Sequence, residues 1–128
     1  MYALGTASKK KLATTHRDMQ AVVELAITLT DVDFSFVEGE RSLKQQIKNV
    51  KNGVSWTLES KHLPNDDGDV LAGDIYPWVD GKTSMDREHF KRVAKAMFNA
   101  AQGLGIHIEW GGFFPKEQED MPHWELKS

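Results

Sequence analysis

The sequence predicts a small single domain of the α+β class, with about three helices packed on one antiparallel sheet. Its 128 residues suit one domain, and folding at this size buries roughly two-thirds of the surface that the unfolded chain exposes. Segments with a helical period alternate with short segments rich in aromatic and β-branched residues. Hydrophobic residues make up 40% and charged residues 27% of the chain, a composition typical of soluble globular domains rather than of disordered or membrane proteins.

Three stretches carry the apolar spacing of amphipathic helices, at residues 8–29, 41–52 and 84–104. We expect the first to be one long or broken helix, because Thr15 and the aspartate three residues later resemble a capping box. In the second, Ile47 continues the apolar period and is expected to face the core. Each helix would therefore bury one face.

Short segments between these helices are expected to form strands. Residues 33–38 place Phe34 and Phe36 on one face, and residues 106–110 alternate strictly between apolar and polar. A brief apolar stretch at residues 54–58 leads toward a histidine. These segments supply the strands of the predicted sheet.

Charge and cysteine content exclude several classes of function. The formal net charge of −3 argues against a protein that grips nucleic-acid phosphates. The single basic run, Lys9 to Lys11, is expected to be a solvated helix start. With no cysteine, disulfides, thiolate catalysis and cysteine zinc sites are excluded. Neither a signal peptide nor a membrane span is recognisable, so we expect synthesis in the cytoplasm and no membrane insertion.

Two histidines and an aspartate offer the ligand mix of a catalytic zinc ion. His62, Asp74 and His123 supply two neutral imidazoles and one carboxylate, and three protein ligands leave a fourth position for water. Asp120 precedes His123 by three residues, so both side chains can face one site if the segment turns. Such residues also occur together by chance, and the motifs around them carry more weight.

Four motifs surround these residues in order: Ser60-x-His62, Ala72-Gly-Asp-Ile-Tyr-Pro77, Ile108-Glu-Trp-Gly-Gly112 and Asp120-x-Pro-His-Trp-Glu-Leu126. Together they resemble the zinc D-alanyl-D-alanine carboxypeptidase family, in its branch of phage endolysins and bacterial L-alanyl-D-glutamate endopeptidases. The likeness covers nearly the whole chain. It implies one zinc peptidase domain over residues 1–128, of the hedgehog/DD-peptidase-like fold, with no separate wall-binding domain.

The resemblance also implies a role for each site residue. Zinc would bind His62, Asp74 and His123, and Asp120 would act as general base. Arg41, which ends the motif Glu38-Gly-Glu-Arg, would bind substrate and share the charge that develops on the carbonyl oxygen. The further substrate-binding candidates are Gln45, Ser60 and Trp110, of which Ser60 can instead stabilise the loop beside its histidine and Trp110 can also serve packing.

The loop between the first two ligands departs from the family pattern. Asp74 follows His62 by twelve residues, a longer interval than is typical, and the extra residues are expected to form an inserted loop. Asp67 and Asp69 are alternative carboxylate ligands by distance, although the strand-like context favours Asp74. The acids at 66, 67 and 69 could instead bind Ca²⁺, but a solvated turn is the simpler interpretation.

The expected function is hydrolysis of the peptide stem of bacterial peptidoglycan, by an L-alanyl-D-glutamate endopeptidase acting as a phage endolysin. Such a protein would wait as a monomer in the host cytoplasm until it is released to the cell wall. One alternative is a D-Ala-D-Ala carboxypeptidase or dipeptidase of the same fold. The other is a non-catalytic wall-binding module.

Overall fold

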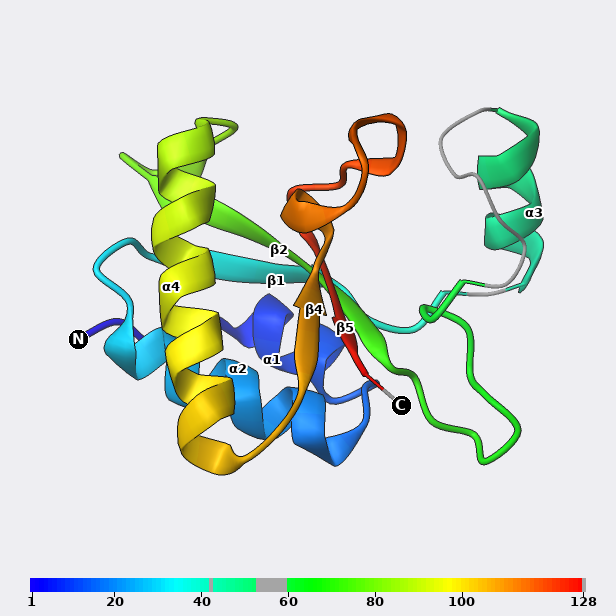
Figure 1. The fold of residues 1–128 in the computed structure, drawn as a ribbon, viewed down its shortest axis with the longest axis horizontal. Helices are drawn as coiled ribbons and strands as arrows, with labels where there is room; N and C mark the ends of the chain where they lie inside the picture. The colour runs from blue at the N-terminus through cyan, green and yellow to red at the C-terminus, as the bar shows by residue number, and fades with distance from the viewer. Residues whose placement is uncertain (42, 53–59, 128) are drawn as a thin grey trace.

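The computed structural model, which describes residues 1–41, 43–52 and 60–127, contains one antiparallel sheet flanked by helices (Figure 1). Its strands are β1 (Phe34–Glu38), β2 (Ala72–Val79), β3 (Lys82–Thr83), β4 (Ile108–Trp110) and β5 (His123–Leu126). The spatial order is β1-β2-β5-β4, and β3 pairs with the far end of β2. The predicted fold class is confirmed, whereas the expected strand at residues 54–58 lies outside the described residues.

The described helices are α1 (Thr6–Leu12), α2 (Arg17–Leu29), α3 (Leu43–Lys51) and α4 (Arg87–Leu104). The first predicted helix is broken into α1 and α2, which gives four helices rather than about three. Thr15 donates its hydroxyl back to the carbonyl of Leu12, and the ring of His16 accepts a hydrogen bond from the amide of Asp18. The cap of α2 is therefore His16, not Thr15.

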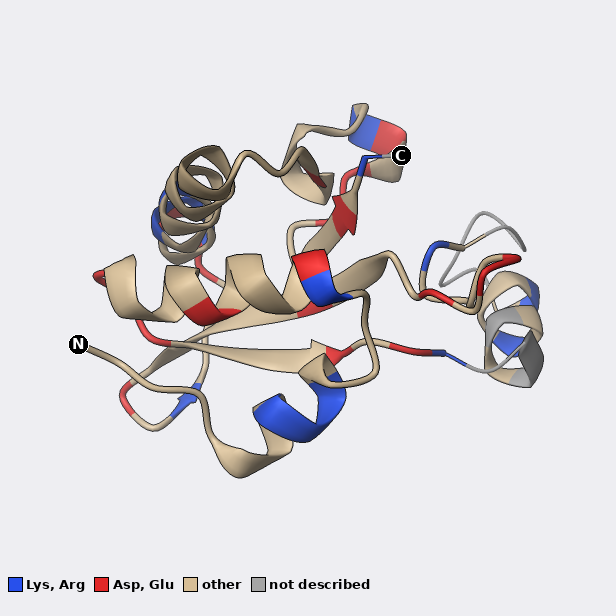
Figure 2. Ribbon diagram, turned by 90° about the horizontal axis from the view of Figure 1, so that it is seen from below, with Lys and Arg blue, Asp and Glu red and all other residues tan. Residues whose placement is uncertain are grey.

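The basic run lies at the end of α1, not at a helix start. Lys9, Lys10 and Lys11 occupy the last turn of α1 and are exposed. Figure 2 shows this turn as a stretch of blue, the colour of Lys and Arg. Cations in a last turn interact favourably with the helix dipole. The run therefore has a local structural reason on a solvated surface.

The hydrophobic core lies between the sheet and helices α2 and α4. Buried side chains of both helices form one cluster with Phe36 of β1, Ile75 of β2 and Trp124 of β5. Gly73 lies directly against the Phe36 ring, where any side chain would overlap it. The core therefore fixes β2 against β1. The residues of β2 that alternate with the core-facing ones are thereby held in place on the other face of the sheet.

Helix α4 has clear boundaries at both ends. Asp86 accepts a hydrogen bond from the amide of Glu88, and Gly105 ends the helix with a positive φ of 69°. That conformation costs glycine little. Within the described part of the chain, neither α4 nor any other helix combines the length and apolar character needed to cross a membrane.

None of the described side chains of helix α3 belongs to this core, contrary to the sequence-based expectation. It stands apart from the other helices, on the far side of the molecule (Figure 1). Ile47, expected to be buried, is 48% exposed. Amphipathic spacing shows that a helix has an apolar face, but it does not identify the surface that covers it.

Candidate active site

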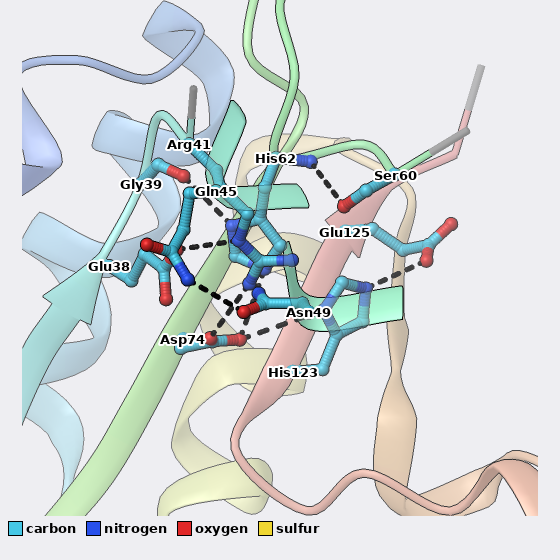
Figure 3. A network of polar contacts seen from close by, with 10 residues as sticks. All are labelled: Glu38, Gly39, Arg41, Gln45, Asn49, Ser60, His62, Asp74, His123 and Glu125. Carbon is cyan, nitrogen blue, oxygen red and sulfur yellow. Dashed lines mark hydrogen bonds and ion pairs between the residues drawn. The ribbon is translucent and has the colours of Figure 1, made fainter. Parts of the chain in front are cut away.

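Three side chains from separate segments meet on one face of the sheet, near the start of β2 (Figure 3). Asp74 pairs in register with His123 of β5, and paired residues project to the same face of a sheet. His62 reaches them from the loop before β2. Its Nε2 lies 3.2 Å from Asp74 Oδ1, and His123 Nδ1 lies 3.6 Å from the same oxygen. One ligand-type atom from each residue lies within 4.8 Å of the others.

Main-chain and hydroxyl groups fix the orientation of His62. Its Nδ1 lies 2.8 Å from the carbonyl oxygen of Gly39, and since a carbonyl only accepts, this nitrogen carries the proton. Ser60 Oγ accepts from the amide of His62, and the His62 carbonyl accepts from the amide of Arg41. These contacts leave Nε2 facing Asp74, and the hydroxyl of Ser60 stabilises the loop that carries His62.

His123 is fixed by a carboxylate. Its Nε2 lies 2.9 Å from Glu125 Oε1, and Lys61 Nζ lies 2.9 Å from Glu125 Oε2. The ring of His62 meets the ring of His123 edge-on, with centroids 5.2 Å apart. Both histidines therefore present one nitrogen to Asp74 and use the other for a supporting hydrogen bond.

The centre of this cluster contains polar atoms without partners. His62 Nε2 and Asp74 Oδ1 are buried, and neither has a hydrogen bond. Leaving such groups buried and unpaired is costly, and two facing lone pairs repel each other. A proton or a cation between them would relieve this cost. With two imidazoles and one carboxylate, the residues fit a zinc ion.

Protonation at the site reflects the same arrangement. Burial alone would raise the pKa of Asp74, but its close contacts with the rings of His123 and His62 outweigh burial and hold the pKa well below its ordinary value. For His123, burial favours the neutral ring, yet the nearby carboxylate of Asp74 and the hydrogen bond to Glu125 raise its pKa to about 9. In the absence of a metal the site therefore holds a proton on His123 at neutral pH.

Asp120 lies at the rim of this cluster. The amide of His123 donates to the Asp120 carbonyl over 3.0 Å, which is the turn that the three-residue spacing required. Desolvation of its carboxyl, and then repulsion from Asp74, raise the pKa of Asp120. A carboxyl with a raised pKa beside the three site residues is suited to accept and return a proton.

Arg41 lies beside Asp74, three residues after the end of β1. Its Nε donates to Glu38 Oε1 over 2.7 Å, and its Nη2 lies 3.9 Å from Asp74 Oδ2. The side chain is 11% exposed, so the guanidinium is held close to the cluster while part of it faces solvent. Gln45 of α3 donates to Asn49 Oδ1, and Figure 3 places both beside Arg41.

Trp110 and Gly111 support the segment that carries Asp120. Trp110 is 5% exposed, stacks on Trp124, and donates its indole N–H to the Met121 carbonyl. A side chain at Gly111 would overlap the Asp120 carbonyl oxygen. Trp110 therefore packs in the core and contacts the segment that carries Asp120.

The inserted loop forms a turn away from the cluster. Asn65 Oδ1 accepts from the amides of Asp67 and Asp69, and Asp66 and Asp67 are exposed. Asp69 Oδ2 lies 4.0 Å from His16 Nε2. The carboxylate that meets the two histidines is thus Asp74, not Asp67 or Asp69.

Sequence reasoning missed the residues that support the histidines. Glu125 shares a strand face with His123 because they are two residues apart, and this alternation was available as a signal. The contacts of Gly39 with His62 and of Lys61 with Glu125 join distant segments. No local pattern could have indicated them.

Fold and site together define a small α+β domain with a group of two histidines and one aspartate able to hold a metal ion. A family model described as phage L-alanyl-D-glutamate peptidase matches residues 1–126. The L-alanyl-D-glutamate peptidase of Escherichia phage T5 is 35% identical over 114 residues, which cover 86% of this chain and 80% of that protein. The crystal structure of the Serratia marcescens L-Ala D-Glu endopeptidase ChiX matches with a TM-score of 0.87 and 33% identity, over 98% of this chain and 90% of the other.

The chain belongs to the phage L-alanyl-D-glutamate peptidase family. The resemblance seen in the sequence motifs is confirmed, as is the fold that it implied.

Proposed function

We propose that this protein is a zinc-dependent L-alanyl-D-glutamate endopeptidase that hydrolyses the peptide stem of peptidoglycan as a phage endolysin. The observation that carries the proposal is the pair of unsatisfied buried atoms, His62 Nε2 and Asp74 Oδ1, beside His123. Membership of a peptidase family gives this pair its chemical context.

His62 Nε2, Asp74 and His123 Nδ1 are the atoms that would hold zinc. When bound there, zinc supplies Lewis-acid polarisation of the scissile carbonyl and a water whose pKa falls toward about 7. Supporting hydrogen bonds to Gly39 and Glu125 keep both ring nitrogens directed at the ion position.

Asp120 would move the proton. Its carboxylate takes a proton from the attacking water and returns it to the amine that leaves when the peptide bond breaks. A pKa raised by desolvation and by Asp74 favours the return step, because the acid form is then more accessible near neutral pH.

Arg41 would stabilise the negative charge that develops on the carbonyl oxygen, since a donor oriented in advance acts most strongly in a site shielded from water. Its bond to Glu38 supplies that orientation. We propose that Gln45 binds substrate next to Arg41 and that Ser60 stabilises the loop before His62. Trp110 would support the segment that carries Asp120.

The bond cleaved distinguishes this proposal from the carboxypeptidase alternative. Both relatives are named for the L-Ala–D-Glu bond, which favours an endopeptidase. Mass spectrometry of purified peptidoglycan after digestion should show stems beginning at D-glutamate. Release of terminal D-alanine with the L-alanyl bond intact would overturn the proposal.

The variant Asp120→Asn separates catalysis from wall binding. Loss of the proton acceptor should reduce the rate of stem cleavage by about 10²- to 10⁴-fold, with zinc content unchanged because Asp120 is not among the three site atoms. If wild-type and variant protein both bind the wall and leave its stems intact, the protein is a binding module instead.

For cellular function, we propose that the protein acts after release to the cell wall, as the role of an endolysin requires. A monomer is sufficient, because the described site residues all come from one chain. Sedimentation of the zinc-loaded protein, combined with its activity at the same concentration, tests this point.

A further inference from the structure

We propose that Glu125 is a positioning residue for His123, and that Lys61 holds Glu125 in place for this task. This inference rests on the proposed zinc site. It assigns a role to two side chains outside the ligand set, and that role can be tested by metal affinity apart from turnover.

The geometry forms a chain of three side chains that ends at the cluster. Lys61 Nζ contacts Glu125 Oε2 at 2.9 Å, and Glu125 Oε1 contacts His123 Nε2 at 2.9 Å. His123 Nδ1 then faces Asp74. Each carboxylate oxygen of Glu125 thus has its own partner, so the group is oriented by both of its oxygens.

Strand geometry places Glu125 where it can do this. His123 and Glu125 are alternate residues of β5, and their partners in register on β2 are Asp74 and Ala72. The small side chain of Ala72 leaves room opposite Glu125. Because both strands pair regularly here, the distance from Glu125 to the His123 ring is set by the sheet and not by a flexible loop.

Lys61 stabilises the buried carboxylate of Glu125. The Glu125 side chain is only 15% exposed, and an unpaired carboxylate at that depth would be costly. Lys61 compensates its charge and is itself anchored by the carbonyl of Leu126 at 3.0 Å. Lys61 is the residue next to His62 in the sequence, so one short segment supports both histidines.

The two histidines are supported by different chemistry. A neutral carbonyl, that of Gly39, accepts from His62, whereas a charged carboxylate accepts from His123. A carboxylate on the far nitrogen of a metal-binding imidazole fixes its tautomer and increases the basicity of the ligating nitrogen. Glu125 should therefore strengthen zinc binding through His123 without touching the ion.

The test compares Glu125→Gln with Glu109→Gln. Glu109 lies beside Glu125 in the sheet and pairs with a lysine, Lys127, and it is not a partner of His123 in the described contacts. Competition with a chromophoric chelator at fixed pH should show zinc binding weakened by about 10- to 100-fold in Glu125→Gln, and unchanged within about twofold in Glu109→Gln.

A second measurement does not need zinc. In the metal-free protein, the Nε2–H proton of His123 should give a downfield NMR resonance that exchanges slowly with water, because it is hydrogen-bonded to a carboxylate. This resonance should be lost or shifted upfield in Glu125→Gln and kept in Glu109→Gln. Circular dichroism of each variant identifies any that fails to fold.

Lys61→Met provides an independent variant if Glu125→Gln does not fold. It leaves the Glu125–His123 bond possible but removes the cation, so zinc affinity should fall by a smaller factor, about 3- to 10-fold. If the wild-type protein binds zinc and the variants bind it equally well, this inference alone is overturned. Wild-type protein that binds no zinc would overturn the proposed function and this inference with it.

Discussion

At His62, one hydrogen bond decides which ring nitrogen faces the site. Because Nδ1 donates to Gly39, the bare Nε2 points at Asp74 Oδ1, 3.2 Å away. The structure thus keeps two acceptor atoms in contact inside the protein. Functional sites commonly retain such locally unfavourable arrangements, which a bound ligand relieves. The polar cluster lies on one face of β2, and the residues on the other face of the strand are buried in the core.

Protonation of His123 should make zinc binding depend on pH. The pKa of His123 is raised to about 9, so in the metal-free protein its stabilising interaction is fully present below pH 6.5 and is lost as the pH rises through 9. Zinc requires the deprotonated nitrogen. Binding at pH 7 should therefore release about one proton, and the affinity should increase toward pH 9.

Calorimetry in two buffers of different ionisation enthalpy measures the number of protons released when zinc binds. Asp74 contributes none near neutral pH, because its pKa is held low and it is already ionised. Equal binding enthalpies in both buffers would mean that His123 is neutral before zinc arrives, in contradiction to its position between the carboxylates of Asp74 and Glu125.

Replacement of Arg41 tests charge stabilisation. Arg41→Met should lower kcat by about 10²- to 10³-fold, the usual cost of one oriented donor, while zinc content stays unchanged. Arg92→Met is the control, since Arg92 forms an exposed pair with Asp31 away from the site. A kcat within threefold of wild type would assign Arg41 to structure or substrate affinity alone.

Among the elements, the connection from β4 to β5 matters most for the site. The short helix η1 (Gly111–Phe113) follows β4, and η2 (Lys116–Gln118) leads toward Asp120. The amide of Asp120 donates to the Gly111 carbonyl, and an ion pair joins Glu119 to Arg87 of α4. Close approach at Gly111 thus holds Asp120 and His123 together.

Gly111→Ala should disturb both stability and activity. The added methyl group would overlap the Asp120 carbonyl oxygen and approach His123 Cβ to 2.9 Å. Overpacking of this kind costs about 1–3 kcal/mol, and the segment must shift to accommodate it. Urea denaturation should show a lower midpoint, with a marked loss of stem cleavage.

Gly103→Ala is the matched control. Gly103 lies in α4, with open space where the methyl group of an alanine would lie, so alanine should be neutral or stabilise the helix by up to about 1 kcal/mol. If both alanine variants were equally stable and active, the Asp120 segment would not depend on contact with Gly111.

Across the whole molecule, the site is a product of strand register more than of local sequence. Residue types and motif order were enough to predict the α+β class, the three ligand candidates and Asp120. The spacing of Asp120 from His123 allowed a shared site only if the segment turned, and the structure contains that turn. What could not be predicted was the environment of α3 and the contact of Lys61 with Glu125, because these depend on which distant segments pack together.

The composition of the inserted loop likewise could not decide the carboxylate ligand. Asp67, Asp69 and Asp74 all follow His62 at distances that a flexible chain can close. Only the pairing of Asp74 with His123 in the sheet separates them. A register is a non-local property, and a single sequence contains no direct record of it.

Anomalous diffraction from zinc-loaded crystals at the zinc edge is the most direct measurement of how this molecule works. We expect one strong peak about 2.0–2.2 Å from His62 Nε2, an Asp74 carboxylate oxygen and His123 Nδ1, with Asp120 nearby and outside the coordination sphere. A peak ligated by Asp67 or Asp69, or no peak between the two histidines, would contradict the proposed site and the chemistry assigned to it.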